Sequence, residues 1–379
     1  MAVVKKGGMN YRRDDELSKE EFMSMALNLA ENVAGQTSPN PPVGSVVIKN
    51  GRIVGIGAHL KAGERHAERI AVEMAGENAF GSDVYVTLEP CAHHGRTAPC
   101  ADFLIEKGVR KVYVATLDPN PLVSGRGIEK LRNAGVEVEV GINKEAADTL
   151  YRPFFHFIQT KRPFVTIKTA VTTDGKIAAY TNDSKWITSE QARMDVHEIR
   201  NKHDAILVGI NTVLNDNPLL TVRLPQGGKN PIRVILDTHL RTPLEANVLN
   251  GEAPAIIFCG GDAPIEKEQL LQSLGAEVIR LQETSISIAQ VLKELGERNI
   301  MTLLVEGGAE VNGSFLQEQA FQQLILYMAP KIIGGKTAAT SFGGLGLSLM
   351  KDALPLLFEK VEMIGRDIKI TATVQKEGN

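Results

Sequence analysis

The amino-acid sequence predicts an α/β protein built from two domains. Strand patterns and helix patterns alternate along most of the 379 residues, which is typical of folds made of packed sheet and helix layers. The alternation is interrupted once, at the polar run 159–163, which ends in a helix-breaking proline. A chain of this length can also bury two separate cores. We therefore expect a flexible tail at 1–17, a first domain at 18–159 and a second domain at 160–379.

The first domain contains the elements of a layer sandwich. Ser18 and Glu21 form a capping box in front of a stretch whose apolar residues recur at helical spacing. Asn50 followed by Gly51 marks a tight turn between two apolar segments, which predicts a hairpin. In chain order we expect a helix behind Ser18, strands at 43–48 and 52–56, a helix at 66–76, a strand at 84–86, a helix at 100–108, and then a strand, a helix and a strand up to Val140.

The second domain repeats this alternation. Short apolar segments predict strands at 164–170, 205–208, 232–236, 255–258, 277–281, 302–305 and 324–327, with helical patterns between most of them. The stretch 358–374 predicts a further hairpin that turns near Gly365. Cys259 ends one of the apolar strands, and we expect it to be a core residue.

Charge and cysteine content exclude several classes of protein. The net charge is −3, so no basic surplus indicates binding to nucleic acid. No apolar run approaches the roughly 20 residues of a membrane span, and Lys5 and Lys6 are not followed by the hydrophobic region of a secretory signal. Three cysteines are too few for a disulfide framework and favour a reducing compartment. We therefore expect a cytoplasmic protein that binds neither membranes nor nucleic acid.

His66, Cys91 and Cys100 predict a catalytic metal site. One nitrogen and two sulfur donors suit zinc, and three protein ligands leave a fourth tetrahedral position open for water or substrate. Cys100 opens a predicted helix, and a helix N-terminus favours the thiolate form of a cysteine. Glu68 lies two positions after His66, and we expect it to transfer protons rather than to bind the metal.

This metal site has alternatives. A His-x-Glu pair alone is usually part of a solvated helix face, and isolated cysteines are usually core residues, so the prediction depends on their conjunction at element boundaries. His93 and His94 are competing ligands, although their use would leave Cys100 unexplained. A non-catalytic, zinc-stabilised binding protein would normally supply four protein ligands. Eight residues separate the two cysteines, whereas the general deaminase signature has two.

The motifs together resemble those of the bifunctional deaminase–reductases of riboflavin biosynthesis, a family in which the cysteines have this eight-residue spacing. The resemblance extends from about Glu20 to the C-terminus. It rests on the segments 38–44, 57–59, 66–68, 90–100, 118–121, 125–127, 174–176, 184–188, 215–218 and 305–308.

The resemblance implies two enzymatic steps. The first domain, a cytidine-deaminase-like α/β/α layer sandwich, would use one zinc ion per chain to remove the 2-amino group of a diamino-ribosylamino-pyrimidinone 5′-phosphate. The second domain, with a dihydrofolate-reductase-like α/β fold, would reduce the ribosyl group to ribityl with NADPH. The rival interpretation is a nucleic-acid or nucleoside base deaminase with an appended domain, which the near-neutral charge disfavours.

The same resemblance implies contacts for the substrates and for NADPH. In the deaminase, the implied substrate contacts are Asn40, His59, Arg96 and Asn120. In the reductase, they are Ser184, Arg200, Leu219, Arg223 and Glu306. The implied NADPH contacts are Ala170, Trp186, Thr212, Asp216, Thr238 and a loop made of Gly308, Ala309, Glu310, Val311, Asn312, Gly313 and Ser314.

In the second domain, the residues themselves support part of this assignment. Gly307 and Gly308 follow an apolar strand and precede a helical stretch, an arrangement that either presents backbone N–H groups to a phosphate or is a tight turn. Lys168 lies in an apolar strand and requires a carboxylate partner, for which Glu306 is the candidate. Among the groups that could manage protons, Asp216 is our first choice, followed by Lys168 and Glu306. The alternative role of Asp216 is to order the turn in which it lies.

Three further side chains of this domain have two interpretations each. Arg200 and Arg223 could clamp a phosphate, or they could be surface residues. Trp186, the only tryptophan, could stack on a nicotinamide or pack in a core. We also expect the chain to form a homo-oligomer, either a dimer or a tetramer.

Overall fold

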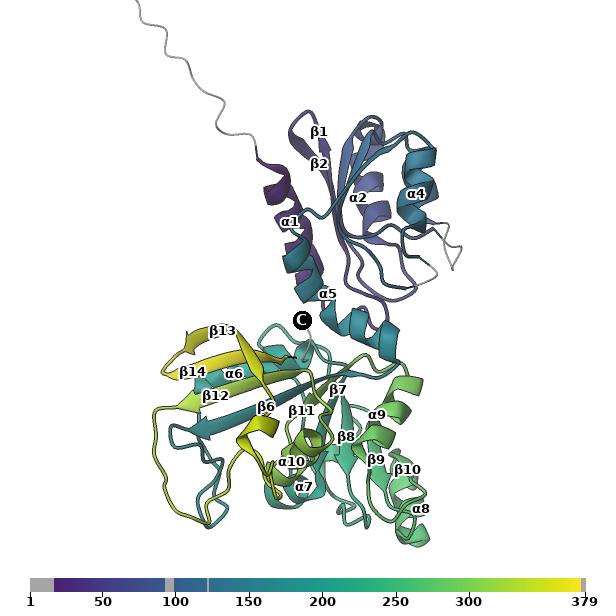
Figure 1. The fold of residues 1–379 in the computed structure, drawn as a ribbon. Coiled ribbons are helices and arrows are strands. Elements are labelled where there is room, and N and C mark those ends of the chain that lie inside the picture. The colour runs from purple at the N-terminus through teal and green to yellow at the C-terminus, as the bar shows by residue number, and fades with distance from the viewer. Residues whose placement is uncertain (1–16, 93–98, 121–122, 376–379) are drawn as a thin grey trace, which may run out of the picture. The chain divides into compact units, whose positions relative to one another are not determined.

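The computed structural model describes residues 17–92, 99–120 and 123–375. The chain folds into two compact units, each of which packs mainly against itself (Figure 1). The first contains the described residues up to Val33 together with Pro42–Tyr151, and the second contains Ala34–Pro41 and Arg152–Asn379. None of the helices within the described ranges is long and apolar enough to cross a membrane.

Helix α5 (Lys144–Thr160) contributes to both units. The predicted domain boundary between residues 159 and 160 falls at the end of this helix, whereas the packing changes from one unit to the other between Tyr151 and Arg152. The predicted domains and the two packed units therefore differ in the second half of α5 and in the segment Ala34–Pro41.

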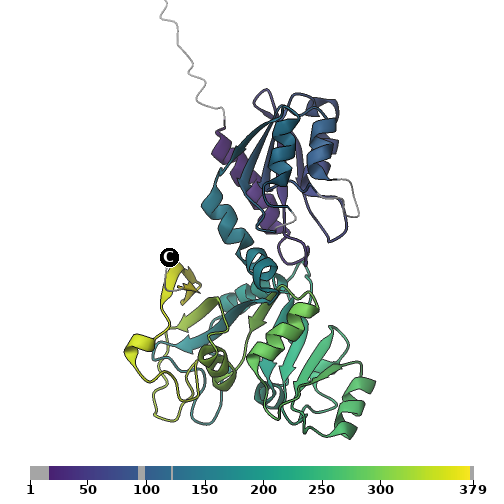
Figure 2. The same ribbon diagram turned by 45° about the vertical axis from the view of Figure 1, so that its right-hand side comes forward.

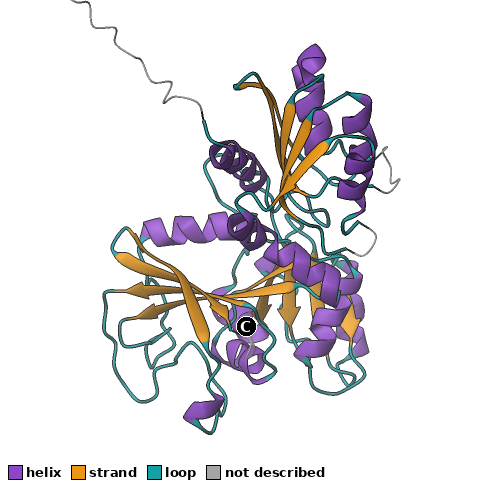
Figure 3. Ribbon diagram, turned by 45° about the horizontal axis from the view of Figure 1, so that its top comes forward, coloured by secondary structure: helices purple, strands orange, loops and turns teal. Residues whose placement is uncertain are grey.

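The first unit is a three-layer α/β/α sandwich around a five-stranded sheet (Figure 3). The strand order is β2-β1-β3-β4-β5, with β1 antiparallel to both neighbours and β3, β4 and β5 parallel. Its elements are α1 (Lys19–Asn32), β1 (Gly44–Lys49), β2 (Arg52–Ala58), α2 (Ala67–Ala75), η1 (Gly76–Ala79), β3 (Asp83–Leu88), α3 (Cys100–Glu106), β4 (Lys111–Thr116), α4 (Arg126–Asn133) and β5 (Glu137–Val140).

The two faces of this sheet are covered by different helices. Helices α2, α3 and α4 share one core with Val84 and Val86 of β3. Tyr85 points to the opposite face, where its ring centroid lies 5.4 Å from that of Phe22 on α1. Figure 1 shows α1 and α2 on opposite sides of the strands. The predicted sandwich is confirmed.

Local chemistry explains where these elements begin. In the predicted capping box, the Ser18 hydroxyl accepts the Glu21 N–H at 3.2 Å, and the Glu21 carboxylate accepts the Ser18 N–H at 2.7 Å. Helix α2 lies directly on β2, because a Cβ atom at Gly57 would stand only 2.3 Å from the Ala67 carbonyl oxygen. Glycine at this position therefore lets the first turn of α2 approach the sheet.

The second unit contains a nine-stranded, mostly parallel sheet (Figure 2). Its strand order is β10-β9-β8-β7-β11-β6-β12-β14-β13. The pairings of β14 with β12 and with β13 are antiparallel, and the pairings from β10 to β12 are parallel. The strands are β6 (Phe164–Thr172), β7 (Ala205–Gly209), β8 (Ile232–Leu236), β9 (Ala255–Cys259), β10 (Glu277–Arg280), β11 (Thr302–Val305), β12 (Gln323–Ala329), β13 (Leu356–Ile364) and β14 (Asp367–Val374). The helices are α6 (Glu190–Asn201), α7 (Ile210–Asp216), η2 (Asn247–Leu249), α8 (Ile265–Ser273), α9 (Ile288–Glu297), α10 (Ala309–Gln317) and η3 (Met350–Asp352).

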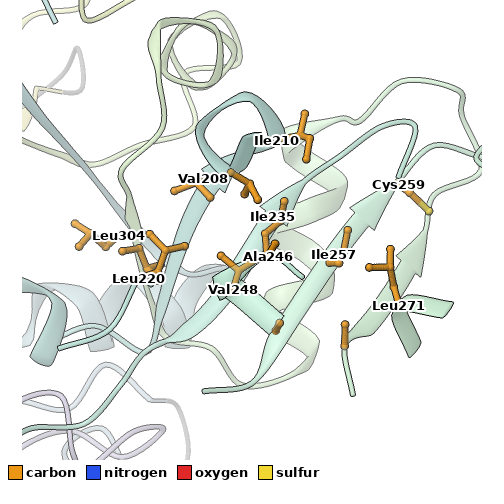
Figure 4. Packing of buried hydrophobic residues seen from close by; sticks show 14 of the residues in the cluster. Val208, Ile210, Leu220, Ile235, Ala246, Val248, Ile257, Cys259, Leu271 and Leu304 are labelled. Atoms are coloured by element: carbon orange, nitrogen blue, oxygen red, sulfur yellow. The ribbon is translucent and has the colours of Figure 1, made fainter. Parts of the chain in front are cut away.

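Alternate residues along the central strands fill two cores in this unit. Ile206, Val208 and Cys259 belong to the core beneath α6, α7 and α8 (Figure 4). Leu207 and Phe258 belong to the core beneath α9 and α10. The predicted strands, the hairpin and the core position of Cys259 are confirmed. Because β6, β7, β8 and β11 are parallel, the residues that follow their carboxyl ends meet at one edge of the sheet.

Candidate active sites

The predicted metal ligands come together in the first unit. His66 is the N-cap residue of α2, Cys91 follows β3, and Cys100 is the first residue of α3. The His66 Nδ1 atom lies 3.2 Å from the Cys100 Sγ atom and 3.6 Å from the Cys91 Sγ atom. All three ligand atoms lie within 4.8 Å of one another, which is close enough for one ion to contact them all.

The first turn of α3 positions the two cysteines. The Cys100 N–H donates to the Cys91 Sγ atom at 3.3 Å, and the Ala101 N–H donates to the Cys91 carbonyl oxygen at 3.2 Å. N–H groups at a helix N-terminus have no partner within the helix, so they are available to a thiolate. Contact with the Cys100 side chain, and then with the His66 ring, lowers the pKa of the Cys91 thiol.

Glu68 lies beside these ligands in the first turn of α2. It is only 3 % exposed, and this burial raises the pKa of its carboxyl group. A raised pKa favours the protonated form, in which a carboxyl group can donate a proton. Its position and its pKa therefore suit the proton transfers that the sequence predicted for it.

His59 lies next to the ligand His66. The two rings meet edge to face with their centroids 5.3 Å apart, and the His59 Nδ1 atom lies 3.1 Å from the Arg65 carbonyl oxygen. Burial lowers the pKa of His59, so its neutral form is favoured. The structure thus places one predicted substrate contact directly beside the metal ligands.

The structure describes two of the other three predicted deaminase contacts, Asn40 and Asn120. Asn120 lies in a turn ordered by Asp118, whose carboxylate accepts the Asn120 N–H at 2.8 Å. Asn40 lies in the segment Ala34–Pro41, which belongs to the second unit. Arg96 lies outside the described residues, and so do the competing ligands His93 and His94.

The sequence interpretation overlooked Glu89, which lies two residues before Cys91. This carboxylate is 4 % exposed and accepts two backbone hydrogen bonds, from Gly125 at 3.0 Å and from Gly127 at 3.1 Å. The sequence signal was weak, because the position of Glu89 directly after the apolar strand β3 does not show which backbone donors its carboxylate reaches.

In the second unit, a hollow of about 610 Å³ lies at the carboxyl edge of the parallel strands. Its volume is within the roughly 300–1,000 Å³ of ligand sites. Most of the reductase residues that the sequence predicted line this hollow: Lys168, Ala170, Ser184, Thr212, Asp216, Glu306, Gly308, Ala309, Glu310 and Val311.

Glu306 is the centre of an ion cluster at the wall of this hollow. Its carboxylate accepts two bonds from Arg200, at 2.7 and 3.0 Å, and lies 3.4 Å from the Lys168 Nζ atom. Burial alone would raise the pKa of Glu306, but Arg200 and Lys168 hold it well below its usual range. The predicted pairing of Lys168 with Glu306 is confirmed. Arg200 is a third member of this ion cluster, which the sequence analysis did not predict.

The two predicted phosphate-clamp arginines make different contacts. The Arg200 guanidinium donates two hydrogen bonds to the Glu306 carboxylate and a third to the Thr221 carbonyl oxygen at 3.1 Å. Arg223 donates from its guanidinium to the Thr221 hydroxyl at 3.2 Å. Thr221 thus connects the two arginines, but Arg200 already has a bidentate partner within the protein.

Trp186 lies apart from the 610 Å³ hollow. It is 63 % exposed, so it is not a core residue, and the Arg193 guanidinium lies 4.5 Å from its ring centroid. It lines a second hollow of about 660 Å³ together with Lys331 and Arg366. Seven other predicted reductase contacts are also not among the described residues that line the first hollow: Arg200, Leu219, Arg223, Thr238, Asn312, Gly313 and Ser314.

The predicted loop 308–314 is mostly helical. Gly308 is the N-cap residue of α10, which begins at Ala309, so only the first part of this stretch faces the hollow. Asn312 donates instead to the Ser341 carbonyl oxygen at 2.8 Å, and a Cβ atom at Gly313 would stand 2.5 Å from the Gly343 carbonyl oxygen. The expectation of a loop was wrong, because helical hydrogen bonding begins directly after Gly308.

Comparison with known proteins assigns the two parts of the chain to two different families. Residues 17–116 match the family described as the cytidine and deoxycytidylate deaminase zinc-binding region, and residues 163–370 match the RibD C-terminal domain. The chain is 49 % identical over 361 residues to the riboflavin biosynthesis protein RibD of Bacillus amyloliquefaciens, covering 95 % of this chain and 97 % of that protein. It is 47 % identical to RibD of Aquifex aeolicus, covering 93 % and 97 %.

Solved structures show the same similarity over both units. RibD of Acinetobacter baumannii has a TM-score of 0.85 and 37 % identity, covering 94 % of this chain and 99 % of that chain. The deaminase/reductase of Thermotoga maritima has a TM-score of 0.84 and 40 % identity, covering 94 % and 98 %. One nitrogen and two thiol donors within reach of a single ion also fit the zinc of this deaminase family. The chain therefore belongs to the RibD family, whose members combine a zinc-binding pyrimidine deaminase and a reductase of riboflavin biosynthesis in one polypeptide.

Proposed function

We propose that this chain catalyses two consecutive reactions on a pyrimidine ribosyl phosphate. The first is hydrolytic deamination of 2,5-diamino-6-ribosylamino-4(3H)-pyrimidinone 5′-phosphate. The second is NADPH-dependent reduction of the product, 5-amino-6-(5-phosphoribosylamino)uracil, to its ribityl form. The observation that carries the proposal is the cluster of His66, Cys91 and Cys100 beside the buried Glu68, in a chain whose other unit is a reductase.

In the deamination, the ring must gain a hydroxyl oxygen and lose ammonia. His66, Cys91 and Cys100 would hold one zinc ion per chain, which would supply a water molecule that ionises near pH 7. Glu68 transfers one proton from the attacking water to the ring nitrogen and then transfers the second proton, from the added hydroxyl group, to the amino group, which leaves as ammonia. His59, in its neutral form, lies where it can orient the pyrimidine.

The reduction requires an electrophilic carbon and a hydride donor. Opening of the ribosylamine breaks the bond between C1 and the ring oxygen. The nitrogen loses a proton and the ring oxygen gains one, which leaves an imine and a hydroxyl group. Bound NADPH would supply the hydride for the new C1–H bond, and a proton from the protein or solvent would complete the amine. The uncapped N-terminus of α10, preceded by Gly307 and Gly308 at the hollow, fits the phosphates of this cofactor.

Two assays on the purified protein test the proposal. Ammonia release from the diaminopyrimidine phosphate, compared with cytidine and a tRNA loop, measures the deamination. Oxidation of NADPH, compared with NADH, on the deaminated product measures the reduction. Turnover of cytidine or the tRNA loop in preference to the pyrimidine phosphate would contradict the proposed substrate.

The two activities are expected to be separable, as the predicted domains 18–159 and 160–379 imply. Glu68→Gln should leave reduction of the already deaminated substrate within about threefold of the parent rate, because Glu68 lies in the first unit and the hollow lies in the second. Stopped-flow NADPH oxidation measures this rate. Parallel loss of both activities in a folded Glu68→Gln protein would indicate one composite site instead.

We propose that Asp216 transfers a proton during ring opening. It is the last residue of α7 and lines the hollow together with Lys168 and Glu306. We expect Asp216→Asn to lower kcat of the reduction by about tenfold, or 1.4 kcal/mol, because the two neighbouring groups can compensate in part. Single-turnover NADPH oxidation gives this rate.

Arg223→Ala provides the contrast to Asp216→Asn. If Arg223 holds the 5′-phosphate equally in the ground state and the transition state, its loss should raise KM and leave kcat nearly unchanged. An unchanged kcat in a folded Asp216→Asn protein would reduce Asp216 to a structural residue of its turn and direct attention to Lys168 and Glu306.

Three broader predictions accompany this function. We propose that the protein works in the cytoplasm, takes a small-molecule substrate without binding nucleic acid, and assembles into a dimer or tetramer. Sedimentation velocity of the purified chain measures the assembly directly.

A further inference from the structure

Glu89 connects the end of β3 to the N-terminus of α4. Its Oε2 atom accepts the Gly125 N–H at 3.0 Å, and its Oε1 atom accepts the Gly127 N–H at 3.1 Å. Both N–H groups belong to the start of a helix, where no backbone carbonyl is available to accept them. One buried carboxylate therefore satisfies two backbone donors, and the positive end of the helix dipole favours its charge.

The same turn of α4 packs directly against the peptide that precedes Cys91. A Cβ atom at Gly127 would stand 1.9 Å from the Pro90 carbonyl oxygen and 3.4 Å from the Glu89 Oε1 atom. No side chain can be accommodated in that space. The backbone of Glu89 and Pro90 is thus held between the sheet, where the Glu89 N–H donates to the Thr116 carbonyl oxygen, and the first turn of α4.

Cys91 has a second attachment on its other side. Its carbonyl oxygen accepts the Ala101 N–H, and its Sγ atom accepts the Cys100 N–H. These bonds tie Cys91 to α3, the helix that carries the neighbouring ligand Cys100. Helix α4 carries none of the three ligands. It packs against α3, which carries Cys100, and it contacts the loop that carries Cys91 through Glu89 and Pro90.

We propose that Glu89 is a positioning residue of the zinc site, which holds the Cys91 thiolate in place for the metal by attaching the ligand loop to α4. The inference deepens the proposed zinc-dependent deamination and rests on it. Glu89 does not touch substrate or metal in this role. It sets the position of the backbone from which one ligand projects, so a small displacement of the loop changes the distance between Cys91 and the other two ligand atoms.

Glu89→Gln is the variant that tests this role. Glutamine keeps the shape of the side chain, but it offers one oxygen acceptor and turns an NH₂ group toward the other backbone N–H donor. We expect zinc affinity to fall by about 10- to 100-fold, the usual effect of losing an outer partner of a metal ligand. Competition with a chromophoric chelator measures this affinity. Substitution with cobalt(II) should show a weaker or shifted thiolate-to-cobalt absorption band.

The matched control is Glu129→Gln, which removes the same charge from an exposed position on α4. It should bind zinc as the parent does. If Glu89 had only a structural role, its variant would unfold more easily while the folded protein kept normal zinc affinity and a normal cobalt spectrum. Zinc affinity within about twofold of the parent, with an unchanged cobalt band, would overturn the proposal.

A measurement on the unaltered protein covers the case in which Glu89→Gln fails to fold. Coupling between sites is reciprocal, so zinc binding should slow hydrogen exchange at the Gly125 and Gly127 amides. Equal exchange in the zinc-free and zinc-loaded protein would overturn the inference. Failure of the proposed function would look different. A parent protein that binds zinc but releases no ammonia from the pyrimidine phosphate would contradict the activity. The zinc affinity of Glu89→Gln would still decide the role of Glu89.

Discussion

Replacement of Glu68 by glutamine is expected to lower the rate of deamination by about 10²- to 10⁴-fold, the range that a positioned acid–base group contributes. Zinc content should remain at one ion per chain, because Glu68 is not one of the three residues whose ligand atoms lie within 4.8 Å of one another. The amide has the size of the carboxyl group but cannot carry a proton from the water to the ring. Ammonia release under single-turnover conditions, with metal analysis of the same sample, measures both quantities.

Glu73→Gln is the control for this variant. Glu73 lies on the same helix, where its carboxylate pairs with Arg65 at 2.8 Å on the surface. Exposed pairs of this kind contribute roughly 0–1 kcal/mol, so this change should leave deamination near the parent rate. Deamination at parent rates by a zinc-loaded Glu68→Gln protein would remove Glu68 from the mechanism.

Replacement of Cys100 by alanine is expected to remove most of the zinc and, with it, the deamination. Two ligands would remain, His66 and Cys91, and the His66 Nδ1 atom would lose the sulfur that lies 3.2 Å away. Zinc in proteins is held by three or four side chains, so two cannot retain it against a chelator. Elemental analysis after dialysis measures the zinc, and NADPH oxidation on the deaminated substrate shows whether the second unit is still folded.

Cys259→Ala separates loss of a ligand from loss of a buried thiol. Cys259 is also buried, but it belongs to the core of the second unit. Its replacement should cost some stability and no zinc. Full zinc and full deamination in Cys100→Ala would contradict the ligand assignment and would bring His93 or His94 into consideration.

Much of the fold could be predicted from local patterns. The strand at 164–170 and the helix behind Ser18 depend on neighbouring residues, through apolar periodicity in one case and the Glu21 cap in the other. The hairpin at Asn50 depends on a turn that favours positive φ, and the structure has φ of 51° there. The division of the chain is harder to place, since the polar run 159–163 marks the end of α5, whereas the packing passes from one unit to the other within that helix.

The candidate sites were predictable where short motifs carry them. His66 and Glu68 lie within one helical turn, and Cys91 and Cys100 lie beside the ends of neighbouring elements, so a metal site could be inferred from the conjunction of these residue types at element boundaries. Glu89 was missed because its partners, Gly125 and Gly127, lie 36 and 38 positions away. No local pattern predicts which backbone donors a buried carboxylate will reach.

By itself, the sequence predicted the alternation of strands and helices, because apolar periodicity depends on neighbouring residues. It also predicted the candidate ligands His66, Cys91 and Cys100 and the carboxylate of Glu68, because their residue types stand at the ends of predicted elements. The sequence suggested Lys168 as the partner of Glu306, whereas only the tertiary structure showed that Arg200, 106 positions away, pairs with the same carboxylate. It also decided that Trp186 lies outside the hollow that Asp216 lines. The physical reason is the strand order of the second sheet, which places β11 between β7 and β6 and so brings distant segments to one edge.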